Sequence, residues 1–299
     1  MSKRSAEEEL KHIADYDKDH CWQHDIRLNN LEEDLRFCKF TLDDVKNLKV
    51  SDFLFKPITD KGERKSAIEF IKRHEWLGNL SQYTTHWFGA YHKHMLAGVI
   101  LMNMPNAFSK LLGEETPKLE RLISRGACVS WSPKNLGSSF IMWCINWMVK
   151  NTNYRLFTAY SDPTAKELGT IYQACNFYYL GNTSGTGTRY VNPYTGKIVS
   201  DRFFRVRSAY KKYAKELGIL WEKNWNNDQK MLWENVPPEV EKQLRDFSKT
   251  KQSTSKKILM PMKHKYAFVL GASKAETKKL RKQFTDKNCV KPYPKERGK

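Results

Sequence analysis

The sequence lacks long apolar runs, which argues against a membrane protein. No uninterrupted apolar stretch reaches the ~18 residues that a transmembrane helix requires. The first residues, Met1–Glu9, contain no apolar segment of the kind that directs export. We therefore expect a soluble protein of the cytoplasm, with no membrane partner.

Paired cysteines are also missing. The six cysteines are scattered at positions 21, 38, 128, 144, 175 and 289, without a CxxC pair. This spacing gives neither a disulfide framework nor a zinc site, and it indicates reduced thiols. Cys21 and His24 lie close together but have no second pair at ligand spacing, so a packed cysteine and a surface histidine explain them better.

Acidic residues are few. The 299 residues include 52 Lys and Arg but only 33 Asp and Glu, so the formal net charge is +19. Residues 249–299 hold 16 of the basic and 3 of the acidic residues, and so carry +13 of this charge. Such a concentration at one end favours contact with a nucleic acid over general solubility. A solvated tail without a partner is the alternative.

The stretch 119–181 has the pattern of two parallel strands with crossover helices. We expect a strand at 119–130, a turn at 131–139, an apolar helix at 140–149 and a second strand at 154–160, followed by a helix at 164–176. Parallel neighbours need such long connections. Ligands of these sheets bind where strands end and helices begin.

The remaining segments surround this unit. A helix at 66–74 precedes a hairpin of strands 83–91 and 96–102, and the later helix at 164–176 runs into 177–181. His92 and His94 fall at the hairpin tip, where a solvated turn is the better interpretation than a metal site. We predict a mixed α/β fold with flanking helices in four parts: a helical extension (1–60), a catalytic domain (61–208), a helical segment (209–248) and a basic strand–helix extension (249–299).

Smaller elements are predicted inside these parts. The N-terminal extension should hold helices from about residue 5 and over 29–48, where Thr41 caps a turn that begins with acids. A hairpin is expected at 189–207, a polar linker at 249–257, a strand at 263–270 and a helix at 275–284.

The central turn can bind a phosphate. Backbone N–H groups at a helix N-terminus carry partial positive charge and point outward. Gly137 permits the close approach of a diphosphate, and Lys134 with the hydroxyls of Ser138 and Ser139 adds donors.

Two residues are candidates for proton transfer. Tyr172, on the helix after the second parallel strand, can protonate a thiolate leaving group. A packing tyrosine is the alternative. His74 ends a helix just before Gly78 and should face the region that the sheet encloses, either as a catalytic or as a structural histidine.

The order of these features resembles the GNAT acyltransferases, which bind acyl-coenzyme A. Their turn is usually Gln/Arg-x-x-Gly-x-Gly/Ala and their later helix carries Leu-Tyr-x-x-x-Gly-Phe. Here the turn is Lys134-Asn-Leu-Gly137-Ser-Ser139 and the helix is Ile171-Tyr172-Gln-Ala-Cys-Asn176-Phe177, so both motifs have diverged.

A narrower resemblance, over about residues 66–208, is to the Mom DNA-modification proteins of bacteriophages. It is carried by Leu119-Glu-Arg-Leu with Arg125, Pro133-Lys-Asn135 with Ser138, Tyr160-Ser-Asp162-Pro163, and Gly169–Gly181. The resemblance implies a GNAT-like enzyme that modifies the N6 amine of adenine in phage DNA and blocks host restriction. It also implies acetyl-CoA or another acyl-CoA as donor, with iron implicated in the family.

The resemblance also assigns residues. Arg125 and Ser138, with Asn135 in the matching turn, would contact coenzyme A. His74, Asp162 and Tyr172 would form the reaction centre. His74 and Asp162 are too few ligands to define a metal site.

Double-stranded DNA would then bind through basic side chains. Alternating arginines on one predicted strand and the basic C-terminal segment supply the candidates, with a solvated strand face as the alternative. They are Arg189, Arg202, Arg205, Arg207, Lys263, Lys265, Lys278, Lys279, Arg281 and Lys282.

The adenine would have to be flipped out of the duplex, and Trp76, Trp87 and Tyr83 are candidates to stack on it. His74 or Asp162 would take the proton from its amine. Two other functions fit the sequence: a GNAT enzyme that acylates a protein or small amine, and a non-catalytic GNAT-like protein that binds DNA or a host factor.

Overall fold

The computed structural model describes residues 21–78, 80, 83–105, 107–113, 117–183, 187–228 and 230–295. These residues fall into two compact units. Unit 1 contains the described residues up to 183 and those from 262 onward, and unit 2 contains those between 187 and 261. The helix predicted from residue 5 lies outside the described residues.

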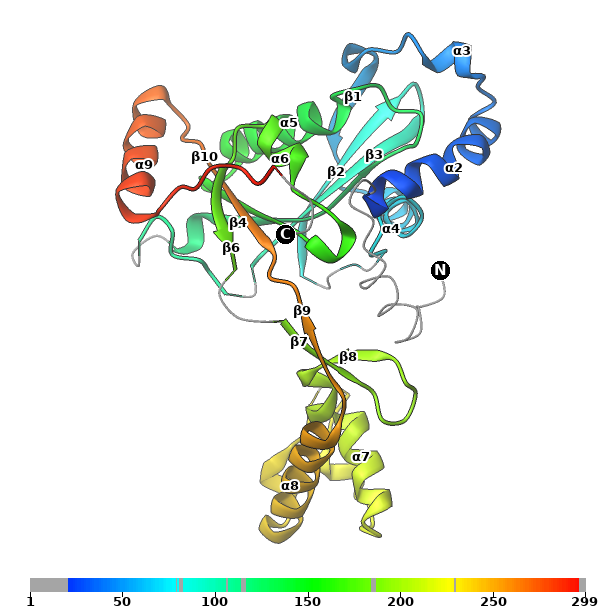
Figure 1. Cartoon of the computed structure of the whole chain (residues 1–299), viewed down its shortest axis with the longest axis vertical. Coiled ribbons are helices and arrows are strands. Elements are labelled where there is room, and N and C mark those ends of the chain that lie inside the picture. The colour runs from blue at the N-terminus through cyan, green and yellow to red at the C-terminus, as the bar shows by residue number, and fades with distance from the viewer. Residues whose placement is uncertain are drawn as a thin grey trace. The chain divides into compact units, whose positions relative to one another are not determined.

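Unit 1 is built on a seven-stranded mixed sheet (Figure 1). Neighbouring strands are antiparallel except for β4 and β5, which are parallel. The predicted mixed α/β fold and the predicted parallel pair are therefore confirmed. In spatial order the strands are β1 (Phe53–Pro57), β2 (Thr84–His92), β3 (Met95–Asn103), β4 (Glu120–Cys128), β5 (Leu156–Ser161), β10 (His264–Val269) and β6 (Tyr178–Asn182).

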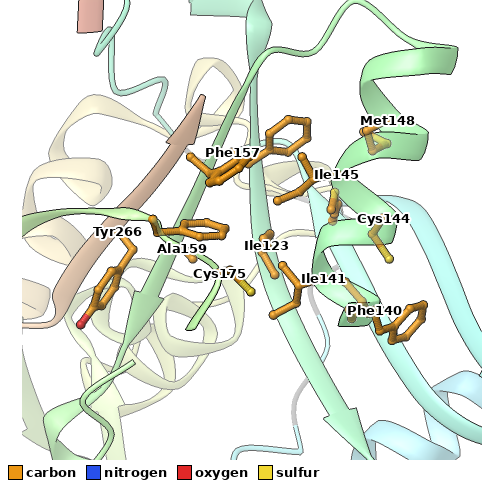
Figure 2. Packing of buried hydrophobic residues seen from close by; sticks show 14 of the residues in the cluster. Ile123, Phe140, Ile141, Cys144, Ile145, Met148, Phe157, Ala159, Cys175 and Tyr266 are labelled. Atoms are coloured by element: carbon orange, nitrogen blue, oxygen red, sulfur yellow. The ribbon is translucent and has the colours of Figure 1, made fainter. Parts of the chain in front are cut away.

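Helices cover both faces of this sheet. Along β3, Val99 and Leu101 pack in a cluster with α4, whereas Ile100 and Met102 pack in a second cluster with α5, as the alternation of strand side chains requires. Figure 2 shows the α5 side of the core. The α-helices of unit 1 are α2 (Trp22–Cys38), α3 (Leu42–Val45), α4 (Lys61–His74), α5 (Leu136–Asn151), α6 (Thr170–Ala174) and α9 (Lys274–Lys287).

Short helices and caps complete the unit. Single 3₁₀ turns occur at η1 (Val50–Asp52), η2 (Pro117–Leu119) and η3 (Pro163–Ala165). Thr41 and Asp44 form a capping box at α3, as predicted. Among the described residues no helix is long and apolar enough to cross a bilayer.

The parallel pair β4–β5 is short. The two strands pair only from Glu120↔Leu156 to Ile123↔Ala159. Beyond this point β4 continues to Cys128, and its residues Arg125–Cys128 pair with β3 alone. The C-terminal ends of β4 and β5 therefore share no backbone hydrogen bonds in the described structure. A ligand that lies between two strands requires such a separation.

Helix α5 begins at Leu136, four residues before the predicted start. Asn135 adopts a left-handed conformation, with φ of 69°, which ends the preceding turn. Gly137, Ser138 and Ser139 thus belong to the first helical turn rather than to the loop. Their amides lie at the helix N-terminus, where intrahelical acceptors are missing.

The helix predicted at 164–176 is broken, so that prediction is wrong in part. Lys166 and Gly169 have φ of 59° and 68°, in the left-handed region, and they separate η3 from α6. Gly169 also lies against the ring of Tyr266, which a Cβ would approach to 2.5 Å. The break exposes the side chain of Glu167 to the ends of β4 and β5 instead of placing it on a helix.

Unit 2 is an insertion between β6 and β10. Its three-stranded sheet has the order β8 (Ile198–Ser200), β7 (Gly187–Val191) and β9 (Lys257–Met260). An aromatic cluster that includes Tyr210, Tyr213 and Trp225 packs beside it. The helices are η4 (Asp201–Arg205), α7 (Arg207–Glu216), η5 (Lys223–Trp225), η6 (Trp233–Asn235) and α8 (Pro238–Thr254).

The structure divides the chain differently from the predicted parts. The predicted helical extension contains β1, an edge strand of the main sheet. The predicted linker 249–257 is helical up to Thr254, where Ser248 donates a hydrogen bond to Phe204 O and anchors α8 in unit 2. The predicted C-terminal strand and helix are present as β10 and α9, but β10 lies between β5 and β6 and so completes the main sheet.

Candidate active site

The first turn of α5 presents free backbone amides. Leu136 N bonds to Pro133 O and Ser139 N to Asn135 O. Within the described part of the chain, the amides of Gly137 and Ser138 have no acceptor. Unpaired N–H groups at the N-terminus of a helix, here one of sixteen residues, can bind an anion.

The side chains around these amides have different surroundings. Lys134 and Asn135 are exposed, whereas Ser138 and Ser139 are half-buried. The hydroxyl of Ser138 donates to Asn135 O, so its proton is already used locally. Arg125 lies on β4 with its Nε 3.9 Å from Glu75 Oε1. The residues predicted to contact coenzyme A therefore lie in two places, the turn before α5 and strand β4.

Helix α6 packs against this turn. A Cβ on Gly137 would lie 2.9 Å from Ile171 Cδ1, so glycine allows the two helices to approach. Cys175 Sγ lies 3.5 Å from Ser138 O. Tyr172, between these two residues in sequence, is thereby held beside the first turn of α5.

The ring of Tyr172 packs against Phe177 and Tyr266 on the α5 side of the sheet. Its hydroxyl donates no hydrogen bond to any described residue. Burial, then the charges of Glu167, Cys175 and Glu75, raise the pKa of Tyr172 far above its usual range. The phenol is therefore protonated at neutral pH, and its raised pKa makes it a weaker acid than an exposed tyrosine.

Carboxylates gather next to Tyr172. Glu75 follows α4 directly, is 7% exposed, and accepts hydrogen bonds from Leu77 N at 3.1 Å and Gly78 N at 2.8 Å. Burial raises the pKa of Glu75 although Arg125 opposes this. Glu167 accepts from Trp76 Nε1 at 3.1 Å and from Asp162 N at 3.2 Å. Burial raises the pKa of Glu167 to about 7, and Glu75 and Asp162 add to the shift.

Asp162 lies at the end of β5 and is fully engaged. It accepts hydrogen bonds from Thr164 N at 3.1 Å and Thr164 Oγ1 at 2.6 Å, and it pairs with Lys263 Nζ at 2.9 Å. It is thus beside Glu167, and its carboxylate oxygens already have donors. Ser161, the residue before it, has a buried hydroxyl without a partner among the described residues.

His74 lies apart from this group. Its Nδ1 is 3.6 Å from Asp34 Oδ2, its ring packs on Phe70, and the residue is 5% exposed. Burial lowers the pKa of His74, against the effect of Asp34. The three predicted reaction-centre residues therefore have separate contacts: Asp162 and Tyr172 both have Glu167 as a neighbour, whereas His74 has its partner on α2.

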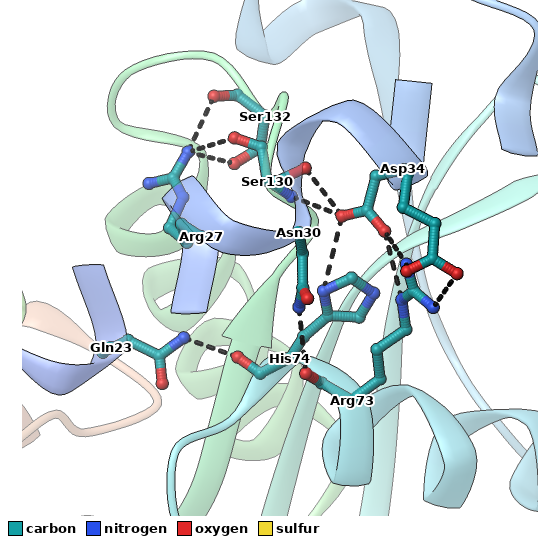
Figure 3. A network of polar contacts seen from close by, with 9 residues as sticks. Gln23, Arg27, Asn30, Asp34, Arg73, His74, Ser130 and Ser132 are labelled. Atoms are coloured by element: carbon teal, nitrogen blue, oxygen red, sulfur yellow. Dashed lines mark hydrogen bonds and ion pairs between the residues drawn. The ribbon is translucent and has the colours of Figure 1, made fainter. Parts of the chain in front are cut away.

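Helix α2 connects the two segments that carry the site (Figure 3). Asp34 accepts hydrogen bonds from Ser130 Oγ at 2.6 Å and from Arg73 Nη2 at 2.8 Å. Arg27 donates to Ser130 O and Ser132 O, after β4. Gln23 bonds both His74 O and Trp76 N, beyond α4. We call these contacts the α2 network.

The predicted DNA-binding arginines do not share a strand face. β8 ends at Ser200, so Arg202 and Arg205 lie on η4 and Arg207 begins α7. The prediction is wrong because Phe204 is drawn completely into the core of unit 2, which bends the chain out of the sheet. Arg205 pairs with Asp201, and Arg189 lies exposed on β7.

The basic residues of unit 1 are placed at two sites. Lys263 pairs with Asp162 at the candidate site, and burial lowers the pKa of Lys265 on β10. On α9, Arg281 donates to Val269 O and is half-buried. The exposed face of α9 carries Lys278, Lys279 and Lys282.

The three predicted stacking aromatics also separate. Trp76 joins the site through Glu167, and its ring packs edge-on against Trp22 at 5.3 Å. Trp87 packs in the cluster beneath α4, and Tyr83 is 62% exposed before β2. Trp76 is therefore the aromatic that borders the carboxylates.

The residues present do not form an iron site. In the described ranges no three His, Cys, Asp or Glu side chains come together in a way that could hold a metal ion. His74 and Asp162 have separate partners, Asp34 and Lys263. We derive no step through a metal.

The cysteines near the site are thiols, not nucleophiles. In the described structure the six cysteines form no disulfide bond. Burial raises the pKa of Cys128 and of Cys175 to about 11. A thiolate is the reactive form, so neither residue can carry an acyl group at neutral pH.

Glu75 and Glu167 were not predicted from the sequence, and Trp76 was predicted as a stacking aromatic but not as the partner of Glu167. Glu75 and Trp76 immediately follow His74, at the point where α4 ends. Gly169 in a supposed helix was the signal that could have revealed Glu167, because glycine inside a helical pattern marks a break.

Sheet order, the parallel pair and the helix N-terminus beside it define a GNAT acyltransferase-like fold. The Mom protein family model matches residues 52–295, and the chain belongs to the Mom protein family. No curated protein sequence matches the chain.

Solved structures similar to this chain include acetyltransferases. One is an acetyltransferase from Bacillus subtilis in complex with CoA, at 9% identity and a TM-score of 0.36, covering 73% of this chain and 99% of that one. Another is a GNAT family acetyltransferase from Elizabethkingia anophelis with acetyl-CoA bound, at 10% identity and a TM-score of 0.32, with the same coverage. These overlaps are partial, and membership of the family rests on the family model.

Proposed function

We propose that this protein transfers an acyl-derived group from acyl-coenzyme A to the N6 amine of adenine in double-stranded DNA. In a phage genome, this modification would protect the DNA from host restriction. The observation that carries the proposal is the pair of unpaired amides, Gly137 N and Ser138 N, in the helical turn against which Ile171 and Cys175, the sequence neighbours of Tyr172, pack. Adenine as the acceptor comes from the resemblance to the Mom DNA-modification proteins, and membership of the Mom protein family supports it.

The residues fit an acyl-coenzyme A. The amides of Gly137 and Ser138 would hold its diphosphate, and exposed Lys134 would add a positive charge. Arg125, on the part of β4 that no longer pairs with β5, would add a second positive charge. When bound, the thioester supplies an activated carbonyl.

Proton transfer then falls to side chains of this site. The adenine amine is a weak nucleophile because its lone pair is delocalised into the ring, so orientation must supply much of the acceleration. Tyr172, whose phenol is protonated at neutral pH, would give its proton to the departing thiolate sulfur.

DNA must be opened for this chemistry. An amine inside a stacked base pair cannot reach a thioester between two strands, so the adenine would be flipped out at a cost of a few kcal/mol. Trp76, fixed through its indole N–H, would offer a ring on which the base can stack. The lysines of α9 and the exposed cations of unit 2 would hold the phosphate backbone without reading its sequence.

Expression in a bacterium, followed by digestion of its DNA to nucleosides and mass measurement, tests the proposal. We expect a new deoxyadenosine species of increased mass that is missing when Tyr172→Phe replaces the wild type. Unmodified deoxyadenosine together with newly acylated host proteins would instead point to an acyltransferase that acts on proteins. Unmodified DNA together with no thermal shift on addition of coenzyme A would point to a non-catalytic binding protein.

A further inference from the structure

Glu167 is the acid of the site whose surroundings suit it to proton exchange. It lies in the break between η3 and α6, where Lys166 and Gly169 turn the chain. Each of its two oxygens accepts one hydrogen bond, Oε1 from Trp76 Nε1 at 3.1 Å and Oε2 from Asp162 N at 3.2 Å. The donors come from two separate segments, so the carboxyl group is held in one orientation.

The carboxylate of Glu167 has no ion-pair partner among the described residues. In the described part of the chain, no Lys or Arg forms an ion pair with Glu167. The groups that face it are Glu75 and Trp76 beyond α4, Asp162 at the end of β5, and Tyr172 on α6. The nearby cations are committed elsewhere: Lys263 pairs with Asp162, and Arg125 lies beside Glu75.

The other two acids are less suited. Asp162 has three donors on its carboxylate, including an ammonium at 2.9 Å. Glu75 binds two amides with Oε2 and has Arg125 beside Oε1. Both carboxylates thus already have a cation and two further donors beside them, whereas Glu167 carries one neutral donor on each oxygen and retains a free lone pair on each.

We infer that Glu167 is the catalytic base: its carboxylate takes the proton that the acceptor amine releases as the amine bonds to the acyl carbon. This assignment rests on the proposed acyl transfer and deepens it. The N–C bond forms, the C–S bond breaks, and the thiolate sulfur takes the Tyr172 proton. Glu167 then returns its proton to the Tyr172 phenolate, so amine and thioester yield amide and thiol with the protein restored.

Trp76 has a positioning role in this scheme. Its indole N–H fixes Oε1 of Glu167, and Gln23 of the α2 network accepts a hydrogen bond from its backbone amide at 3.2 Å. Replacement by Phe keeps an aromatic ring there and removes only the indole donor. The carboxylate of Glu167 would remain but would lose one of its two fixed contacts.

The test compares the wild type with Glu167→Gln, Trp76→Phe and Glu69→Gln in cells. Glu69 is an exposed acid on α4 that pairs with Lys72, and it serves as the matched control. The modified fraction of deoxyadenosine should fall at least ~100-fold in Glu167→Gln, the lower range for general base catalysis. It should fall ~10-fold in Trp76→Phe, as expected for the loss of a single orienting hydrogen bond. Glu69→Gln should match the wild type.

Thermal shifts with coenzyme A, recorded on each purified protein, separate catalysis from folding. We expect the same shift in all four proteins. If Glu167→Gln modifies deoxyadenosine as well as the wild type does, Glu167 is not the base, although the proposed function stands. The same conclusion follows if the modified fraction in Glu167→Gln and Trp76→Phe falls only in proportion to the amount of folded protein. Absence of modified deoxyadenosine with the wild type would overturn the proposed function, and the assignment with it.

Discussion

The carboxylate of Asp34 on α2 accepts a 2.6 Å hydrogen bond from the hydroxyl of Ser130, just beyond the end of β4. The same carboxylate binds Arg73 at the end of α4 and is only 4% exposed. Asp34 thus fixes the segment that leads into the α5 turn relative to the segment that carries Glu75 and Trp76. The N-terminal helix is therefore part of the support of the site and not an accessory layer.

Asp34→Ala should destabilise the protein by about 2–4 kcal/mol, because Ser130 and Arg73 lose a shared buried partner. Asp34→Asn, which keeps the volume and one acceptor, should cost less. Asp43→Ala, at an exposed acid of α3, should change the free energy of unfolding by less than about 0.5 kcal/mol. Urea unfolding measures all three. A cost for Asp34→Ala as small as that for Asp43→Ala would contradict this role.

Tyr172→Phe should slow turnover ~100-fold or more without weakening coenzyme A binding, because only the proton for the leaving group is removed. Tyr178→Phe is the matched control, since Tyr178 stacks on Phe284 in another part of the core. Single-turnover rates and calorimetric affinities, measured side by side, separate the two effects. Unchanged turnover in Tyr172→Phe would remove this residue from the reaction.

The central β–α–β pattern was predictable because it depends on local periodicity and turn residues. The apolar run from Phe140 to Val149, bounded by Gly137 and Asn151, is one helix in the sequence and in the structure. The parallel pairing of its flanking strands follows from the length of that connection. The anion site could be proposed from residues within a few positions of each other.

Long-range placements were not predictable. Asp34 and Ser130 are 96 residues apart in sequence, and no local pattern marks their contact. β10 follows an inserted unit yet lies between β5 and β6, so its segment resembled an extension. Glu167 was not predicted because the sequence over 164–176 has helical spacing. In the structure this segment is broken where Gly169 packs against Tyr266, a contact distant in sequence.

Glu167→Gln should stabilise the protein at pH 8 but not at pH 4. The pKa of Glu167 is about 7 in the folded protein, against an ordinary value of 4.5. Between pH 4.5 and about pH 7, Glu167 is largely ionised in the unfolded chain but still protonated in the folded protein. The free energy of unfolding of the wild type therefore falls as pH rises through this range. The glutamine variant, which cannot ionise, should gain up to about 3 kcal/mol at pH 8. Urea unfolding at both pH values measures this gain, and an equal difference at both would contradict it.

Three lysines on α9 should contribute to DNA binding. Lys278, Lys279 and Lys282 are exposed, and no acid pairs with them among the described residues. Changing all three to Gln should weaken binding of duplexes of any sequence and reduce the slope of log affinity against log salt by up to about 3. The control is Lys46→Gln with Lys72→Gln, at exposed lysines paired with acids. Equal salt slopes for the two multiple variants would exclude α9 from the DNA contact.

Coenzyme A affinity in Ser138→Pro and Ser138→Ala tests the central claim most directly. Proline removes an amide that has no acceptor in the described structure and is tolerated in a first helical turn, whereas alanine removes only the hydroxyl that bonds Asn135 O. If the diphosphate lies on these amides, Ser138→Pro should bind coenzyme A about 10–100-fold more weakly, and Ser138→Ala should stay close to the wild type. Equal affinity of the folded proline and alanine variants would show that coenzyme A does not bind at the N-terminus of α5.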